Sequence, residues 1–489
     1  MIVLGFFTRK VFVDEIGVEY LGLNGLLQNI LGVMTLLEGG FSASVVYNMY
    51  KPLAEDDRPR ILALLQLYKK VYRYIAAGVF LCGLLIYPFL SYFIADVSSL
   101  HYVGVVYFIF LFNSLIQYFT AYKWSIINAS QQNYKLGAIN LTYQVGLSMA
   151  KIAILLFTKN YILYLLVEAL FGVSLNIAIV RKANALFPYI VNAPKYSVEP
   201  ETKQKIVTNM KAIFLHSLGG YFMHSTDNIV MSAYLGVGIV GILSNYGLVT
   251  STVKGLTSNI LNSFSESVGN LMATESDDYA YGVFKIIFFV NFLTISIPVI
   301  LMSVCMQPFI VWWLGENYIL SIGTLAVILF NFYIDGLRTS AYIFKTKSGI
   351  FVQDRFTPLL QGILNLVLSL ILVRVWGLTG VLLATGISIL SIGFWQWPRL
   401  IYKHAFHKSL WPYFKKYLAY TAIFALTLIC SQIVCIPIKC DILLLKVFLN
   451  FLVGVSFTAG IYFLSFRNNP EFISFLSRIK TIFRRETII

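Results

Sequence analysis

The stretch from Gly17 to Asp57, GVEYLGLNGLLQNILGVMTLLEGGFSASVVYNMYKPLAEDD, is long, apolar and almost free of charge in its middle. The exception there is one acid, Glu38, which precedes two glycines. With Leu31 included, polar residues recur at alternating intervals of four and three, at Asn24, Gln28, Thr35, Glu38 and Ser42. This spacing places them on one face of an α-helix. A membrane-length helix with a polar stripe and a carboxylate is expected to face a protein interior or a watery cavity.

The composition extends this interpretation to the whole chain. Of 489 residues, 58% are hydrophobic and 12% are charged, whereas an ordinary soluble domain has about 25% charged residues. Apolar runs of membrane-spanning length recur from end to end, and a helix satisfies its own backbone hydrogen bonds in lipid. A β-barrel would show alternating segments of about 10 residues instead. The sequence therefore predicts an all-α polytopic membrane protein.

We predict about 14 transmembrane helices, the first of them truncated. The apolar stretch at 1–7 is too short to span and lacks the features of a signal peptide, so we interpret it as the end of a first helix that Arg9 and Lys10 terminate. The further predicted spans are 21–50, 72–95, 102–127, 136–158, 161–186, 206–235, 237–268, 282–306, 321–345, 356–375, 377–400, 417–438 and 442–466.

The charges predict an orientation. The formal net charge is +15, and most Lys and Arg residues fall in alternate connections between the predicted spans. By the positive-inside rule these connections, and both termini, are cytoplasmic. A nucleic-acid partner is not expected, because no contiguous soluble domain exists to bind one.

The chain also contains a faint internal repeat. A shift of 219 residues places Gly17 on Gly236 and Gly22 on Gly241. An even number of helices keeps its orientation, so the two copies are parallel repeats, a pattern typical of transporters. The predicted organisation is an N-terminal six-helix lobe at 1–187, a cytoplasmic linker at 188–205, a C-terminal six-helix lobe at 206–400, an amphipathic surface segment at 401–416, two extra transmembrane helices at 417–466 and a basic cytoplasmic tail at 467–489. The segment 401–416 is expected to be a helix on the membrane surface, with a plain interhelical loop as the alternative.

Three motifs carry a resemblance to a known family. EYLGLNGLLQNILGVMTLLEGG, followed by YNMYKPLAEDD (Tyr47 to Asp57), and HSTDNIVMSAYLG (His224 to Gly236) resemble bacterial polysaccharide flippases of the Wzx type, in the multidrug/oligosaccharidyl-lipid/polysaccharide (MOP) exporter superfamily. The resemblance covers essentially the whole chain and implies a 14-helix, two-lobed fold. It further implies export of an undecaprenyl-diphosphate-linked oligosaccharide across the bacterial cytoplasmic (inner) membrane, for O-antigen of lipopolysaccharide, capsule or exopolysaccharide, with polysaccharide polymerase machinery as a partner.

Such a substrate carries an anionic diphosphate and a polar glycan, so its path requires a hydrated cavity with cations. Lys254 is the leading candidate, on a face with Thr250, Ser258, Asn262 and Ser265, although it could instead extend to an interface. Lys151 is a second candidate, with contact to the outer headgroups as the alternative. Arg9 either faces the cavity or is an ordinary helix flank. Arg338 follows Asp335 by three residues, which also permits a simple intrahelical ion pair.

Four acids in the predicted spans are candidates for binding a coupling ion, H⁺ or Na⁺. They are Glu38, Asp227, Glu168 and Asp335. A carboxylate inside a membrane protein binds a cation because the cation relieves its charge. Asp227 could equally cap or bridge helices. We expect no cofactor, since the sequence contains no nucleotide-binding loop and its five cysteines form no metal-ligand pattern.

The sequence leaves alternative functions open. A cation-coupled multidrug exporter of the same fold is the main alternative, although Lys151 and Lys254 suit an anionic substrate better. A membrane glycan polymerase or ligase fits less well, because no extracytoplasmic connection is long. Tyr47, Tyr143 and Tyr246 could stack on sugar rings, with membrane-interface or packing roles as the simpler interpretation.

Overall fold

The fold is entirely helical. A computed structural model describes residues 2–38, 40–94, 101–350, 352–438, 440–474 and 477, and no strand occurs among them. The α-helices are α1 Ile2–Glu15, α2 Val18–Gly32, α3 Phe41–Ala54, α4 Arg58–Ile86, α5 Val103–Ala129, α6 Gly137–Thr158, α7 Tyr161–Leu186, α8 Pro200–His224, α9 Thr226–Leu235, α10 Val237–Asn262, α11 Ser265–Thr274, α12 Asp277–Leu314, α13 Ile322–Leu337, α14 Thr339–Lys347, α15 Thr357–Ser388, α16 Phe394–His404, α17 Trp411–Cys435 and α18 Leu443–Phe466.

Eight helical stretches of the described chain are long and apolar enough to cross a membrane. They are Arg58–Tyr92, Val103–Ala129, Asn133–Thr158, Tyr161–Leu186, Asp277–Leu314, Thr357–His404, Trp411–Cys435 and Leu443–Phe466. The 48-residue stretch Thr357–His404 is not one straight helix, because Gly377 has a non-helical backbone with φ +54°. That break separates the predicted spans 356–375 and 377–400. The prediction of an all-α polytopic membrane protein is confirmed.

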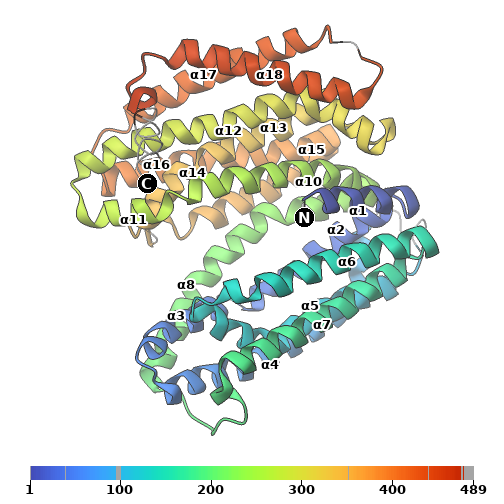
Figure 1. The fold of residues 1–489 in the computed structure, drawn as a ribbon, viewed down its shortest axis with the longest axis vertical. Coiled ribbons are helices and arrows are strands. Elements are labelled where there is room, and N and C mark those ends of the chain that lie inside the picture. Colours follow the sequence, from blue (N-terminus) through green and yellow to red (C-terminus); the bar gives the residue numbers. More distant parts are fainter. Residues whose placement is uncertain are drawn as a thin grey trace, which may run out of the picture. The chain divides into compact units, whose positions relative to one another are not determined.

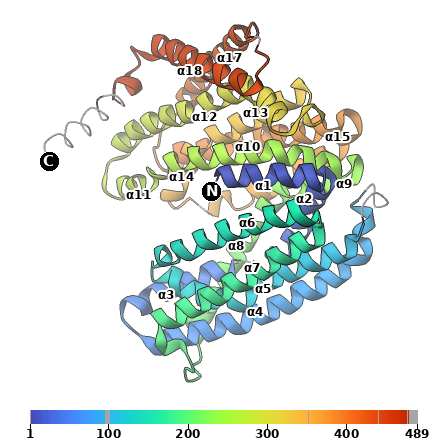
Figure 2. The same cartoon turned by 45° about the vertical axis from the view of Figure 1, so that its right-hand side comes forward.

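The chain packs as two compact units, Met1–Ser244 and Asn245–Ile489. In the first unit α4, α5 and α7 lie side by side in both views (Figures 1 and 2), and α3 packs against α4, α5 and α8. These two units are defined by the contacts within each of them, whereas the predicted lobes were defined by the internal sequence repeat. The lobe boundaries therefore stay a prediction. Most of the predicted basic tail, 467–489, lies outside the described residues.

The second unit is built around α12. In its most apolar window 61% of the residues are buried, against 28% or less in the other spans. Its phenylalanines contact rings of the last two helices, such as Tyr420 at 4.9 Å and Phe466 at 5.7 Å from Phe292. Helices α17 and α18, coloured red, lie together against α12 (Figures 1 and 2). The protein therefore encloses α12, while the other spans leave more apolar surface for lipid.

Four of the predicted spans are interrupted by a break in the helix. The span 21–50 forms α2, a 3₁₀ turn at Val33–Glu38 and α3, with Gly40 in the left-handed conformation at φ +71°. The spans 206–235, 237–268 and 321–345 each form two helices as well. Continuous helices were the wrong expectation there, because an apolar pattern does not reveal where a backbone turns.

Two local predictions need correction. Helix α1 continues past Arg9 and Lys10 to Glu15, so these cations do not terminate it. The segment 401–416 is not a surface helix of its own: α16 ends at His404, and α17 begins at Trp411. Its rings Tyr402 and Phe406, each 2% exposed, pack within the second unit. Packing against the aromatic core explains both residues better than contact with a membrane surface.

The repeat glycines have matching conformations. Gly17 precedes α2 with φ +103° and ψ 164°, and Gly236 precedes α10 with φ +86° and ψ 160°. Gly22 and Gly241 lie where α2 meets the first turns of α10. A Cβ atom on Gly22 would lie 1.7 Å from the Val237 carbonyl oxygen, and one on Gly241 would lie 2.1 Å from the Val18 oxygen. The predicted equivalent glycines thus have equivalent backbone roles.

Candidate functional site

Four of the eight predicted charged residues lie where the helices break. Glu38 ends the 3₁₀ turn before α3, and Asp227 lies in the first turn of α9, directly after the break that follows α8. Asp335 lies in the last turn of α13, and Arg338 is the residue between α13 and α14. A helix end leaves backbone groups without intrahelical partners and carries a partial charge. Discontinuous membrane helices are a recurring way to build ion and substrate sites.

Tyrosine hydroxyls satisfy the polar stripe of the opening stretch. Tyr72 donates a hydrogen bond to Glu38 Oε1, Tyr68 donates to Ser42 Oγ at 2.8 Å, and Tyr161 donates to Asn24 Oδ1. The rings of Tyr68 and Tyr72 stack with centroids 4.3 Å apart. Three members of the stripe therefore face the interior of the first unit as predicted, whereas Gln28 is exposed. The side chain of Thr35 is outside the described ones.

Lys151 and Glu168 form an ion pair in the first unit. Lys151 Nζ on α6 lies 2.8 Å from Glu168 Oε2 on α7, and the side chains are 13% and 38% exposed. The ammonium group also lies 4.4 Å from the centroid of the Tyr164 ring, a cation–π contact. The predicted anion-binding and ion-coupling candidates of this unit are thus partners of each other.

Arg9 lies in the middle of α1 and points to the first turns of α10. Its Nη1 donates to Ser244 Oγ at 2.9 Å. Among the described residues, no acid forms an ion pair with Arg9 and no base forms one with Glu38. The hydrogen-bond partner of Glu38 is therefore a tyrosine, Tyr72, and that of Arg9 is a serine, Ser244.

In the second unit Lys254, Asp335 and Arg338 form one cluster. Lys254 Nζ on α10 lies 2.9 Å from Asp335 Oδ2, and Arg338 Nη1 lies 3.6 Å from Asp335 Oδ1. The Lys254 side chain is 56% exposed and that of Asp335 is 26% exposed, whereas Arg338 is 2% exposed. Lys254 is thus the accessible member. The predicted polar face of Lys254 extends only to Asn262, where α10 ends.

Arg338 is held between a tryptophan and a glycine. Its guanidinium carbon lies 4.0 Å from the centroid of the Trp397 ring. A Cβ atom on Gly393 would lie 2.3 Å from Arg338 Nη2, so only glycine leaves room for the guanidinium there. Gly393 ends a π-helical turn, Ile389–Gly393, that links α15 to α16. Glycine and the wider turn together accommodate a buried cation.

The sequence did not reveal a second buried pair in this unit. Lys345, the last residue of the predicted span 321–345, is 2% exposed and forms an ion pair with the equally buried Asp354. Trp397 Nε1 also donates to Asp354 Oδ2 at 3.0 Å. The turn at Gly349, with φ +71°, brings the two charges together. A Lys and an Asp on either side of a glycine turn are a weak sequence signal for this pair.

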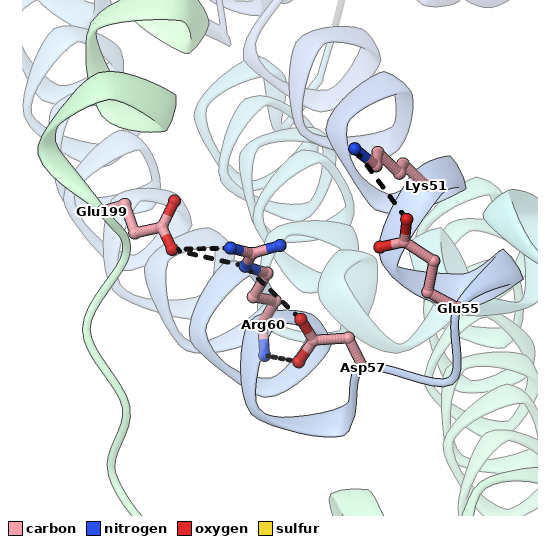
Figure 3. Close-up of polar contacts among 5 residues, drawn as sticks. All are labelled: Lys51, Glu55, Asp57, Arg60 and Glu199. Atoms are coloured by element: carbon pink, nitrogen blue, oxygen red, sulfur yellow. Dashed lines mark hydrogen bonds and ion pairs between the residues drawn. The ribbon is translucent and has the colours of Figure 1, made fainter.

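A group of ion pairs in the first unit joins the start of α4 to the residues before α8 (Figure 3). Arg60 Nη2 lies 3.0 Å from Glu199 Oε1, and the Arg60 backbone N–H donates to the Asp57 side chain at 3.2 Å. Lys51 Nζ lies 3.8 Å from Glu55 Oε1. Gln66 adds two hydrogen bonds to the same connection, at Pro194 and Tyr196. The connection before α8 is therefore tied to α4.

A cavity of about 810 Å³ lies beside Glu38 in the first unit. Ser42, Tyr47 and Tyr50 line it from α3, and Trp124 and Asn128 from α5. Only Glu38, Ser42 and Tyr47 of this lining are candidates on sequence grounds. The intervals Tyr47–Tyr50 and Trp124–Asn128 place each pair on one helix face, which was the available signal. Of the other two tyrosines proposed to stack on sugars, Tyr246 is fully buried and accepts from the Leu320 N–H, and Tyr143 is half-buried beside Phe171.

Among the residues that the structure describes, no group of three or more His, Cys, Asp or Glu side chains could hold a metal ion.

Comparison with solved structures identifies the fold. The chain matches a structure described as the lipid II flippase MurJ in an inward closed conformation, with TM-score 0.70 and 14% identity over 96% of this chain and 97% of the other. An inward-facing MATE family multidrug resistance transporter of the MOP superfamily matches with TM-score 0.59 and 11% identity, over 82% and 94% of the two chains. The MATE multidrug transporter DinF-BH matches with TM-score 0.54 and 16% identity, over 84% and 93%.

Sequence comparison adds no family. No protein-family model matches the chain, and no curated protein matches it. At identities of 11–16% the structural likeness concerns the fold alone. The chain has the all-helical fold that the MurJ flippase and the MATE transporters share.

Proposed function

We propose that this protein is a flippase that moves an undecaprenyl-diphosphate-linked oligosaccharide across the bacterial cytoplasmic membrane by alternating access. Both termini are cytoplasmic in this proposal, in agreement with the positive-inside rule. The glycan then supplies O-antigen, capsule or exopolysaccharide synthesis, and a polymerase uses it on the outer face. The fold supports transport, and the charges of the site support this substrate.

The observation that carries the proposal is the cluster of Lys254, Asp335 and Arg338 at the break between α13 and α14. Two cations and one carboxylate sum to a net positive charge. Lys254 is more than half exposed, so its ammonium group is accessible to a ligand. A charge on a membrane helix is costly and is typically retained for function. Excess positive charge suits a diphosphate.

Charge also separates the proposal from the main alternative. A cation-exporting multidrug transporter would be expected to present unpaired carboxylates. Here Glu168 is paired with Lys151, and Asp335 is paired with Lys254. Glu38 forms no ion pair with a described residue, and Tyr72 donates a hydrogen bond to it.

An apolar cavity supports a lipid-linked substrate. It has a volume of about 490 Å³ and lies in the second unit between α10, α12 and α18. Its lining surface is apolar, with residues such as Val253, Leu301, Phe309 and Phe451. Hydrocarbon is the ligand class that such a surface favours. A lipid carrier brings both an apolar chain and an anionic diphosphate, which matches the two features of this unit.

The proposal also includes a division into two lobes, with a linker at 188–205 and two extra helices at 417–466. It further includes ion coupling through one of four acids, Glu38, Asp227, Glu168 or Asp335. Alternating access needs two bodies that move as wholes, and coupling needs a carboxylate that binds H⁺ or Na⁺ in only some states.

The test is transport in proteoliposomes loaded with lipid-linked oligosaccharide extracted from cells that carry the protein. Arrival of the glycan at the outer surface is measured by binding of a membrane-impermeant lectin. We expect transport by the natural protein, its loss in Lys254→Ala and at least partial retention in Lys254→Arg. Lys408→Ala is the control, because it removes a lysine that also forms an ion pair but is not part of the Lys254 cluster. Lys408 lies in the connection before α17, and its Nζ is 2.5 Å from Oδ1 of Asp278 on α12. Absence of transport by the natural protein, or full activity of Lys254→Ala, overturns the proposal.

A further inference from the structure

The cavity beside Glu38 has three exposed aromatic rings on its wall. Tyr47 is 67% exposed, Tyr50 46% and Trp124 40%. Tyr68 and Tyr72, which lie close to the same cavity through their hydrogen bonds to Ser42 and Glu38, are almost completely buried. The rings of Tyr47 and Tyr50 are nearly perpendicular, at 84°, with centroids 6.4 Å apart. Exposed rings that converge on a cavity of about 810 Å³ form a surface on which a flat apolar face can stack. The volume falls within the range of about 300–1,000 Å³ for small-molecule sites.

Polar groups at the same cavity offer both an acceptor and a donor. Tyr72 donates to Glu38 Oε1 and so orients the carboxylate, which is a hydrogen-bond acceptor when ionised. Asn133 Nδ2 donates to Asn128 Oδ1 at 2.6 Å, and this leaves the Asn128 amide group as a donor. Ser42 is oriented in turn by the hydroxyl of Tyr68. These side chains are therefore held in place before a ligand arrives, which lowers the entropy cost of binding.

The cavity does not suit a phosphate. Among the described residues that line it, there is no Lys, Arg or His. A neighbouring cavity of about 970 Å³ shares Tyr47 and Tyr50, and it does contain cations. Each of those has an acid partner, however: Lys51 with Glu55, Arg60 with Glu199 and Lys205 with Glu201 (Figure 3 shows the first two pairs). This region of the first unit therefore complements neutral polar groups better than an anion.

We propose that the cavity formed by Glu38, Tyr47, Tyr50, Trp124 and Asn128 binds sugar units of the transported glycan. A sugar ring has one face of C–H groups that stacks on aromatic rings, and an edge of hydroxyl groups that both donate and accept hydrogen bonds. The aromatic rings of the cavity contact the C–H face of the sugar, and Glu38 and Asn128 form hydrogen bonds with its hydroxyl groups. An organic cation would use the rings and the carboxylate but not the donor of Asn128. The inference rests on the proposed function for the identity of the glycan and adds a separate place where that glycan is recognised.

The test is direct binding, without transport. The full-length protein in lipid nanodiscs is titrated with oligosaccharide that mild acid has released from the lipid-linked fraction of cells that carry the protein. Saturation-transfer difference NMR reports which sugar protons contact the protein. We expect saturable binding of the released glycan, weakened about tenfold in Trp124→Ala and in Tyr47→Ala, and within about threefold of the natural protein in Trp124→Phe and Tyr47→Phe, which keep a ring.

Two controls match the exposure of the changed rings. Tyr74 is 68% exposed on α4, and Trp312 is 45% exposed on α12; neither is among the described residues that line the cavity. Tyr74→Ala and Trp312→Ala should bind the released glycan as the natural protein does. Glu38→Gln keeps the size of the side chain and should weaken binding by loss of a charged acceptor, which gives a second variant if an alanine variant fails to fold.

The outcomes separate the inference from the proposed function. If the natural protein transports the lipid-linked substrate but binds no released glycan, the inference is wrong and the function stands. If it binds the glycan at this cavity but transports no lipid-linked form, the inference stands and the function is wrong. If tetraphenylphosphonium binds at the cavity and the glycan does not, the inference is wrong and the site belongs to an organic cation.

Discussion

Lys254 and Asp335 form an ion pair, with Nζ 2.9 Å from Oδ2, although 81 residues separate them in the sequence. On sequence grounds the lysine is a candidate for substrate binding and the acid a candidate for ion coupling. Their contact makes these two roles competitive, because an anionic ligand and Asp335 would share the same ammonium group. Binding of a diphosphate to Lys254 would weaken the Lys254–Asp335 pair and leave Asp335 with Arg338, at 3.6 Å, as its remaining cationic partner.

A double-mutant cycle at this pair tests that relationship. We expect Lys254→Ala to abolish transport, and Lys254→Ala with Asp335→Ala to remain inactive, because the ligand for the diphosphate is absent in both. If the pair were only structural, removal of both charges would restore transport. Initial rates in proteoliposomes give the answer, with the thermal midpoint of each variant as the check on folding.

Removal of Glu168 should destabilise the first unit. Glu168→Gln leaves the ammonium group of Lys151, only 13% exposed, without its ionic partner. We expect a cost of about 1–3 kcal/mol, the usual cost of an uncompensated buried polar group. The measurement is the thermal unfolding midpoint in detergent. Glu201→Gln breaks an exposed pair, Lys205–Glu201 at 2.7 Å, and should leave the midpoint unchanged. Equal unfolding midpoints for Glu168→Gln and Glu201→Gln would show that the Lys151–Glu168 pair does not stabilise the first unit.

The close approach of α2 and α10 should not tolerate a methyl group. Gly22→Ala places a Cβ atom 1.7 Å from the Val237 carbonyl oxygen, a backbone atom that cannot rotate away. We expect destabilisation of about 1–3 kcal/mol, typical of overpacking, and a similar effect for Gly241→Ala. Gly238, also on α10, has open space where a Cβ would lie, as far as the described residues extend, so Gly238→Ala is the control. Natural stability of Gly22→Ala in thermal unfolding would show that the helices are not in contact there.

The connection before α8 should become accessible to protease when its ties to α4 are removed. Gln66 donates to the Pro194 carbonyl at 2.6 Å and accepts from the Tyr196 N–H at 3.0 Å, and Arg60 holds Glu199. Gln66→Ala with Arg60→Gln should speed tryptic cleavage after Lys195, as measured by mass spectrometry of the fragments. Lys51→Gln breaks only the Lys51–Glu55 pair beside it and serves as the control (Figure 3). An unchanged rate in the double variant would show that these contacts do not hold the connection.

The structure explains which parts of the candidate site could be predicted. Arg338 and Asp335 are three residues apart, so their contact follows from helical spacing. The partners of Lys151 and Lys254 lie on other helices, and spacing within one helix cannot identify them. Hydropathy ends a predicted span at Lys345, where a lysine is usually solvated, whereas here Asp354 and Trp397 bury it.

By itself the sequence determined that the chain folds as apolar helices in a membrane, where some of those helices begin and end, such as 161–186 and 442–466, and which charged residues lie in the apolar stretches. Hydropathy and spacing are local properties, and lipid requires each span to satisfy its own backbone. Only the tertiary structure decided where four spans break, that Arg9 lies in the middle of a helix, and which acid neutralises which base. These depend on backbone turns and on contacts between distant segments. The carboxylate of Glu38 shows the difference: the sequence placed it on a polar face, and the fold gave it Tyr72 as a donor and a cavity lined with aromatic rings.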